Sequence, residues 1–155
     1  MERNSNLVDV LNDLIRINHD RTEGYAKAAD NAREIDVDLR AIFNRMGEES
    51  RKYALELNDE VIRLGGDPAK GTTAQGKIYR AWMDVKATFT GKDRTSILAA
   101  CEFGEDAAQR AYETALASDA EMVSEIRQLI ASQKSALKTS HDLIKKYRDM
   151  HAVVK

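Results

Sequence analysis

Apolar side chains recur at helical spacing through the first half of the chain. Steps of three and four residues place such side chains on one face of a helix. The first face comprises Leu7, Leu11, Leu14, Asn18, Thr22, Tyr25 and Ala29. The second comprises Leu39, Ile42, Met46, Ser50, Tyr53, Leu57, Val61 and Leu64. Gly65, Gly66 and Pro68 then end the pattern. The pattern predicts two long helices that fold back on each other near residue 34.

Two further helices are predicted in the second half. The third runs from about Asp93 to Ala117, with the apolar positions Ile97, Cys101, Ala108, Tyr112 and Leu116. Ser118 and Glu121 have the spacing of a capping box, so we expect the fourth helix to begin at Ser118 after a short turn. Its inward face comprises Met122, Ile126, Ile130, Gln133, Leu137 and Ile144.

The connection over residues 65–92 is too long for a tight turn. Ile78, Trp82, Val85 and Phe89 share one face of a short helix predicted over 73–88. Such a connection can run the length of a bundle, and a four-helix bundle with one such crossover has the ferritin-like topology. We therefore predict a single all-α domain over residues 1–155: a ferritin-like four-helix bundle with a long crossover between the second and third helices.

Glu105 falls on the apolar face of the third helix, about 40° from its centre line. A carboxylate in a helical core is costly unless it is paired. Folding back near residues 34 and 119 places Asn18 opposite Ser50 and Glu105 opposite Gln133. We therefore predict one hydrogen-bonded polar layer in the middle of the bundle, formed by Asn18, Tyr25, Ser50, Tyr53, Glu105, Tyr112 and Gln133.

A metal site is the alternative interpretation of this layer, and a small-molecule pocket is a third. Di-iron bundles use a Glu from each of two helices and a Glu-x-x-His pair from each of the other two. Iron or another divalent metal would here be held by Glu23, Glu49, Glu102 and Glu105. No His stands at either position that the motif requires, which argues against an oxidase.

Composition excludes several function classes. A net charge of −2 with 32% charged residues does not favour nucleic-acid binding. No apolar run approaches the roughly 18 residues of a spanning helix, and the N-terminus has no signal-type segment, so a cytoplasmic protein is expected. Cys101 lies on an apolar face and is expected to be a buried thiol. No nucleophile elbow, phosphate loop or zinc spacing occurs.

The sequence resembles the bacterial domain-of-unknown-function 2383 family over almost its whole length. The resemblance rests on LNDLI at 11–15, EGY at 23–25, LGG at 64–66, RAWM at 80–83, CE-x-GED at 101–106, Tyr112, Gln133 and His141-Asp142. It implies the ferritin-like fold and no established activity. We expect a non-catalytic protein, linked to stress or envelope maintenance, that forms a homo-oligomer or binds an unidentified protein partner. Trp82 is a possible contact surface. A di-metal, iron-handling protein or oxidase is the alternative.

Overall fold

The computed structural model describes residues 2–32, 37–71 and 94–154, and these contain four α-helices and no strand. The helices are α1 (Glu2–Ala32), α2 (Val37–Arg63), α4 (Arg94–Leu116) and α5 (Ser124–Val154). The predicted all-α class is therefore confirmed. The short helix predicted over 73–88, with Trp82, lies outside the described residues.

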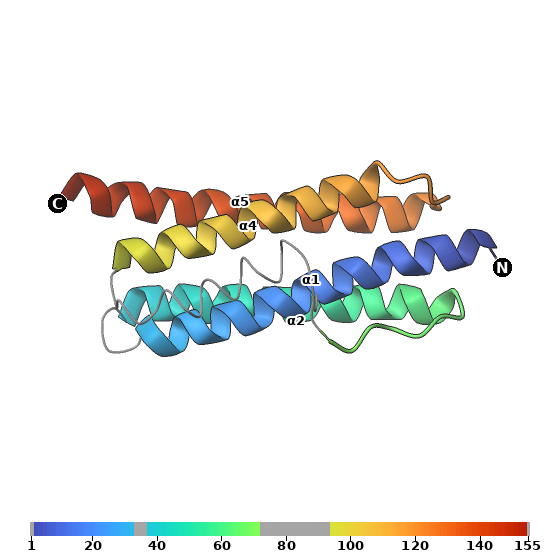
Figure 1. Ribbon diagram of the computed structural model, residues 1–155, viewed down its shortest axis with the longest axis horizontal. Helices are drawn as coiled ribbons and strands as arrows, with labels where there is room; N and C mark the ends of the chain where they lie inside the picture. The colour runs from blue at the N-terminus through green and yellow to red at the C-terminus, as the bar shows by residue number, and fades with distance from the viewer. Residues whose placement is uncertain (1, 33–36, 72–93, 155) are drawn as a thin grey trace.

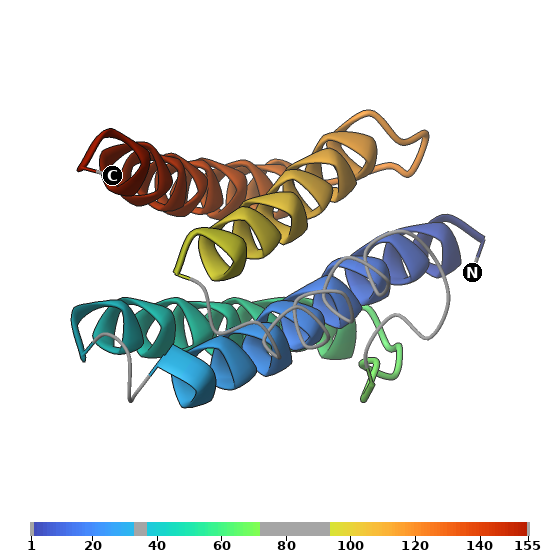
Figure 2. The ribbon, with the colours of Figure 1, turned by 60° about the vertical axis from the view of Figure 1, so that its left-hand side comes forward.

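The four helices form two antiparallel hairpins that pack against each other. Figure 1 shows α1 beside α2 and α4 beside α5, with the N-terminus and the C-terminus at opposite ends. The end of α2 and the beginning of α4 lie at opposite ends of the bundle, so their connection has to span its length (Figure 1). In Figure 2, α4 passes between α5 and the α1–α2 hairpin. This is the predicted ferritin-like topology with its long crossover.

Helix α2 ends at the predicted glycines. The N–H of Gly66 donates to the carbonyl of Val61 at 3.0 Å, and the N–H of Gly65 donates to Ile62 at 3.0 Å. Gly65 has φ of 83°, the left-handed conformation that this Schellman motif requires. A Cβ on Gly66 would lie 2.8 Å from Cγ1 of Val8. The glycine pair therefore both stops α2 and lets the chain approach α1 closely.

Helix α5 begins at Ser124 instead of Ser118, so the predicted capping box does not form. Within its first turn, the N–H groups of Ile126 and Arg127 donate to the carbonyl of Val123. Ala120 is buried and Met122 packs partly buried against the core at this end of the bundle. Because burial of these side chains favours an extended connection over an early helix start, the local capping signal is overridden. The alignment of α5 against α4 therefore differs from the one that a helix start at Ser118 predicts.

The apolar core is divided into two clusters by a band of buried polar residues. One cluster contains Leu11, Leu57 and Ile130, and the other contains Phe43 and Ile144. On every helix a buried polar residue separates the two: Asn18 and Arg21 on α1, Ser50 on α2, Glu105 on α4 and Ser140 on α5. The centre of this bundle is therefore polar, and the candidate site lies there.

Candidate functional site

A fully buried ion pair between Arg21 of α1 and Glu105 of α4 occupies the middle of the bundle. Arg21 Nε donates to Glu105 Oε1 at 2.5 Å, and Nη2 donates to Oε2 at 3.1 Å. Arg21 Nη1 donates to the hydroxyl of Ser50 on α2. The side chains of Arg21 and Glu105 are 0% and 1% exposed. The pair has the bidentate geometry that makes Arg–carboxylate contacts strong and directional, and it joins three helices.

Burial and the charges of this pair shift the pKa values of the ionisable groups around it. Burial by itself lowers the pKa of Arg21, but the charge and hydrogen bond of Glu105, together with contributions from Tyr25 and Tyr112, raise it overall, so the guanidinium stays charged. The guanidinium carbon lies 5.2 Å from the ring centroid of Tyr25. Burial, followed by the Glu105 charge, raises the pKa of the Tyr25 hydroxyl and of the Cys101 thiol. Both groups are therefore neutral at physiological pH.

A chain of hydrogen bonds crosses the bundle next to the ion pair. Asn18 Nδ2 donates to the Tyr112 hydroxyl at 2.8 Å, and that hydroxyl donates to Gln133 Oε1 at 2.7 Å. Gln133 Nε2 donates to Glu56 Oε1 at 3.0 Å. One residue from each of the four helices takes part. Because this series of hydrogen bonds ends at the half-buried carboxylate of Glu56, it connects the core to the surface of α2.

Tyr53 and Glu49 form a separate contact on α2. The Tyr53 hydroxyl donates to Glu49 Oε2 at 3.2 Å. Burial, followed by the Glu49 charge, raises the pKa of Tyr53 to about 12. The backbone carbonyl of Tyr53 also accepts a bond from Gln133 Nε2 at 3.3 Å. Tyr53 thus supports the hydrogen-bonded chain through its backbone and keeps its phenol protonated.

All seven residues predicted for the polar layer are buried, but they form two tiers instead of one. Glu105, Ser50 and Tyr25 surround Arg21, whereas the other tier contains Asn18, Tyr53, Tyr112 and Gln133. The predicted opposition of Glu105 and Gln133 is corrected, because Ser140 is the α5 residue between the two core clusters. This displacement follows from the later start of α5.

Arg21 is the central residue that sequence reasoning missed. It stands three residues after Asn18 and four before Tyr25, both on the inward face of α1. The spacing therefore placed it on that face, and only its residue type suggested an exposed position. A search for a cation within helical reach of the predicted face could have found it.

Residues 6–118 match the family described as domain of unknown function (DUF2383). The chain belongs to this family. A solved structure of a point mutant of Dps1 from Mycobacterium smegmatis resembles the DUF2383 chain with a TM-score of 0.75 and 16% sequence identity. The likeness covers 95% of this chain and 97% of that one, and it confirms the ferritin-like four-helix fold. No curated protein matches the sequence.

The residues of this DUF2383 protein do not fit a di-metal centre around Glu105. Both oxygens of that carboxylate accept bonds from Arg21. Glu49 accepts the bond from Tyr53, and Glu23 lies exposed on α1. Within the described part of the chain, the group of three potential ligands that converges is Glu102, Asp106 and His141, which includes one of the four predicted carboxylates.

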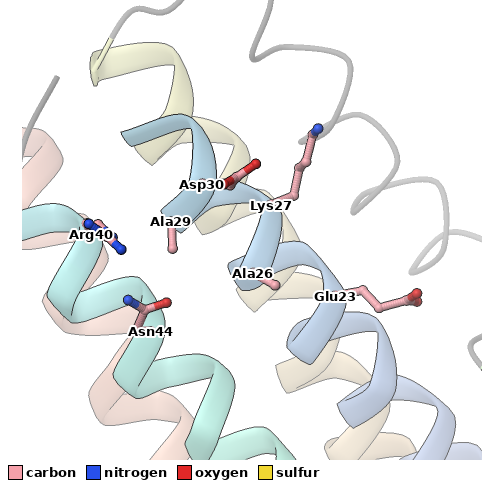
Figure 3. A pocket seen from close by; sticks show the side chains of 7 residues that line it. All are labelled: Glu23, Ala26, Lys27, Ala29, Asp30, Arg40 and Asn44. Carbon is pink, nitrogen blue, oxygen red and sulfur yellow. The ribbon is translucent and has the colours of Figure 1, made fainter. Parts of the chain in front are cut away.

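An open groove between α1 and α2 is the other feature that could hold a small molecule. Its lining residues are Glu23, Ala26, Lys27, Ala29, Asp30, Arg40 and Asn44. Figure 3 shows Ala26 and Ala29 between the two helices, whereas Glu23 and Lys27 point away from α2. Arg40 and Asn44 of α2 are turned toward α1 (Figure 3), so the polar groups of the groove do not all converge on one ligand position. None of the described helices has the length and hydropathy needed to cross a membrane.

Proposed function

We propose that this DUF2383 protein is a cytoplasmic, non-catalytic bundle that acts by assembling with further copies or by binding a protein partner. The observation that supports this proposal is the Arg21–Glu105 pair. In a di-metal bundle, inward-facing carboxylates bind cationic metal ions. Here a guanidinium of the protein itself supplies the positive charge and uses both oxygens of the carboxylate.

The neighbouring groups also argue against chemistry at this position. A general acid or base works best when its pKa lies near the operating pH. Burial and the Glu105 charge move the pKa values of Tyr25 and Cys101 upward, away from that range. Arg21 is fully buried and fixed by Glu105 and Ser50, so it is neither mobile nor open to a substrate. These contacts suit a structural core.

Iron oxidation provides the direct test of the non-catalytic part. Chelator-treated protein is mixed with Fe²⁺ in air, and the rate of Fe³⁺ formation is compared between the unmodified chain and Glu105→Gln. We expect equal rates, neither above the rate in buffer. A rate above buffer that is lost in Glu105→Gln would overturn the proposal. Glu23→Gln, a substitution at an exposed carboxylate of α1, is the matched control.

The outer face of α2 offers a surface for a second copy. Leu55 and Ile62 are 59% and 60% exposed, and their spacing of two helical turns places them on one stripe. A twofold axis between two antiparallel α2 helices would place Leu55 of one copy against Ile62 of the other. Such an interface uses the same patch twice, as the commonest homodimers do. This self-complementarity supports a second copy as the occupant.

Sedimentation velocity tests the assembly. We expect the unmodified chain to form dimers or larger species, and Leu55→Glu with Ile62→Glu to shift it to a monomer. Phe103→Glu with Val123→Glu introduces the same two charges at apolar residues that are 54% and 59% exposed and lie away from α2, so it controls for charge alone. A monomer for the unmodified chain at high concentration, or equal assembly of all three proteins, would overturn this interface.

A further inference from the structure

Glu102, Asp106 and His141 bring three potential metal ligands together on the side of the α4–α5 hairpin. Glu102 and Asp106 are four residues apart on α4, so they share one face of that helix. His141 approaches from α5, and its Nε2 lies 2.6 Å from Asp106 Oδ1. One ligand atom from each of the three residues lies within 4.8 Å of the others. Two elements therefore contribute a mixed oxygen and nitrogen set.

The second nitrogen of His141 is held by another carboxylate. Nδ1 lies 3.2 Å from Asp142 Oδ1, and Asp142 Oδ2 accepts a bond from Lys138 Nζ at 2.9 Å. Metal-binding His residues commonly donate one N–H to such a carboxylate, which fixes the tautomer and directs the other nitrogen at the metal. That nitrogen faces Asp106 here.

We propose that Glu102, Asp106 and His141 bind one divalent transition-metal cation of the Zn²⁺ or Fe²⁺ class. Two carboxylates with one imidazole suit these cations, whereas Mg²⁺ and Ca²⁺ prefer sites made only of oxygen. Ligand atoms about 2.1 Å from a metal lie roughly 3 to 3.5 Å from one another. The three ligand atoms lie within 4.8 Å of one another, and those of Asp106 and His141 are 2.6 Å apart. Binding therefore requires Asp106 and His141 to separate slightly and Glu102 to adjust by rotation about its side-chain bonds.

The surroundings allow a cation to enter. His141 and Asp106 have side chains 19% and 48% exposed, so the site is open to solvent and water can complete the coordination. Three carboxylates, from Glu102, Asp106 and Asp142, gather at the site, which favours a dication. Entry of the cation replaces the direct contact between His141 and Asp106. The site is distinct from the buried Arg21–Glu105 pair, and it does not depend on the proposed assembly.

Calorimetric titration of chelator-treated, tag-free protein with Zn²⁺ tests the site, and the visible absorption of bound Co²⁺ reports its coordination. We expect one ion per chain. His141→Gln and Asp106→Asn should each weaken binding at least tenfold, and Asp142→Asn should weaken it roughly 10- to 100-fold. His19→Gln is the matched control, because His19 is a half-buried His that contacts the Gly71 carbonyl away from the site.

The outcomes separate clearly, and circular dichroism confirms that each variant is folded. Zn²⁺ binding that is unchanged in His141→Gln, or no binding by the unmodified chain, would overturn the proposal. Equal affinity for Mg²⁺ and Zn²⁺ would overturn the class of cation. Binding of Zn²⁺ without any iron oxidation would support this site and leave the non-catalytic proposal intact, so the two can fail independently.

Discussion

Removing either partner of the Arg21–Glu105 pair should be strongly destabilising, whereas removing both should not. Glu105→Leu leaves a guanidinium that is 0% exposed beside the Ser50 hydroxyl and the Tyr25 ring, without its carboxylate partner. An uncompensated buried charge costs about 3–5 kcal/mol. Arg21→Met leaves the Glu105 carboxylate, 1% exposed, in the same position, with a similar cost. Apolar replacement of a whole buried pair is often neutral or stabilising by about 1–4 kcal/mol.

Urea denaturation followed by circular dichroism measures these costs. With a slope of about 2 kcal/mol per molar urea, each single variant should lower the midpoint by roughly 1.5–2.5 M. The double variant Arg21→Met with Glu105→Leu should regain most of that loss, which gives a coupling free energy on the order of 3 kcal/mol. Glu23→Leu with Arg45→Met, two exposed positions, should show negligible coupling. Additive losses in the double variant of the buried pair would refute the reasoning.

Three further predictions follow from the same contacts. Tyr112→Phe removes the hydroxyl that Asn18 donates to, and should cost about 1–3 kcal/mol in urea denaturation; an unchanged midpoint would contradict the role of that hydroxyl. Because the folded-state pKa of Tyr53 is raised to about 12, its contribution to stability should be complete below pH 10 and be lost as the pH rises towards 12, which alkaline denaturation of the unmodified chain and of Tyr53→Phe checks. Gly66→Ala places a methyl group against Val8 and should cost about 1–3 kcal/mol, measured as a lowered melting temperature.

The helices could be predicted from the sequence because their signals are local. The three- and four-residue spacing gives the inward faces, and Gly65 with Gly66 stops α2 through a left-handed backbone conformation. The same spacing placed Glu105 inside, where the structure has it. What these features share is that each depends on residues within two helical turns of one another.

The missing parts depend on contacts between distant segments. Burial of Ala120 at the end of the bundle delays the start of α5, and no local pattern encodes that choice. The delay changes which α5 residues face α4, so Ser140 instead of Gln133 stands at the height of Glu105. For the same reason, the meeting of Glu102 and Asp106 with a His of α5 was not predictable.

The polar tiers explain how two largely apolar hairpins find one alignment. Apolar faces tolerate small displacements along a helix, because the area buried changes little when a helix slides by a turn. A bidentate pair does not, since moving α4 by one turn of about 5.4 Å would separate Glu105 from Arg21 and leave two buried charges. The hydrogen bonds that link Asn18, Tyr112 and Gln133 add a second constraint across the same interface. We therefore infer that the central polar residues determine the axial alignment of the α1–α2 hairpin relative to the α4–α5 hairpin.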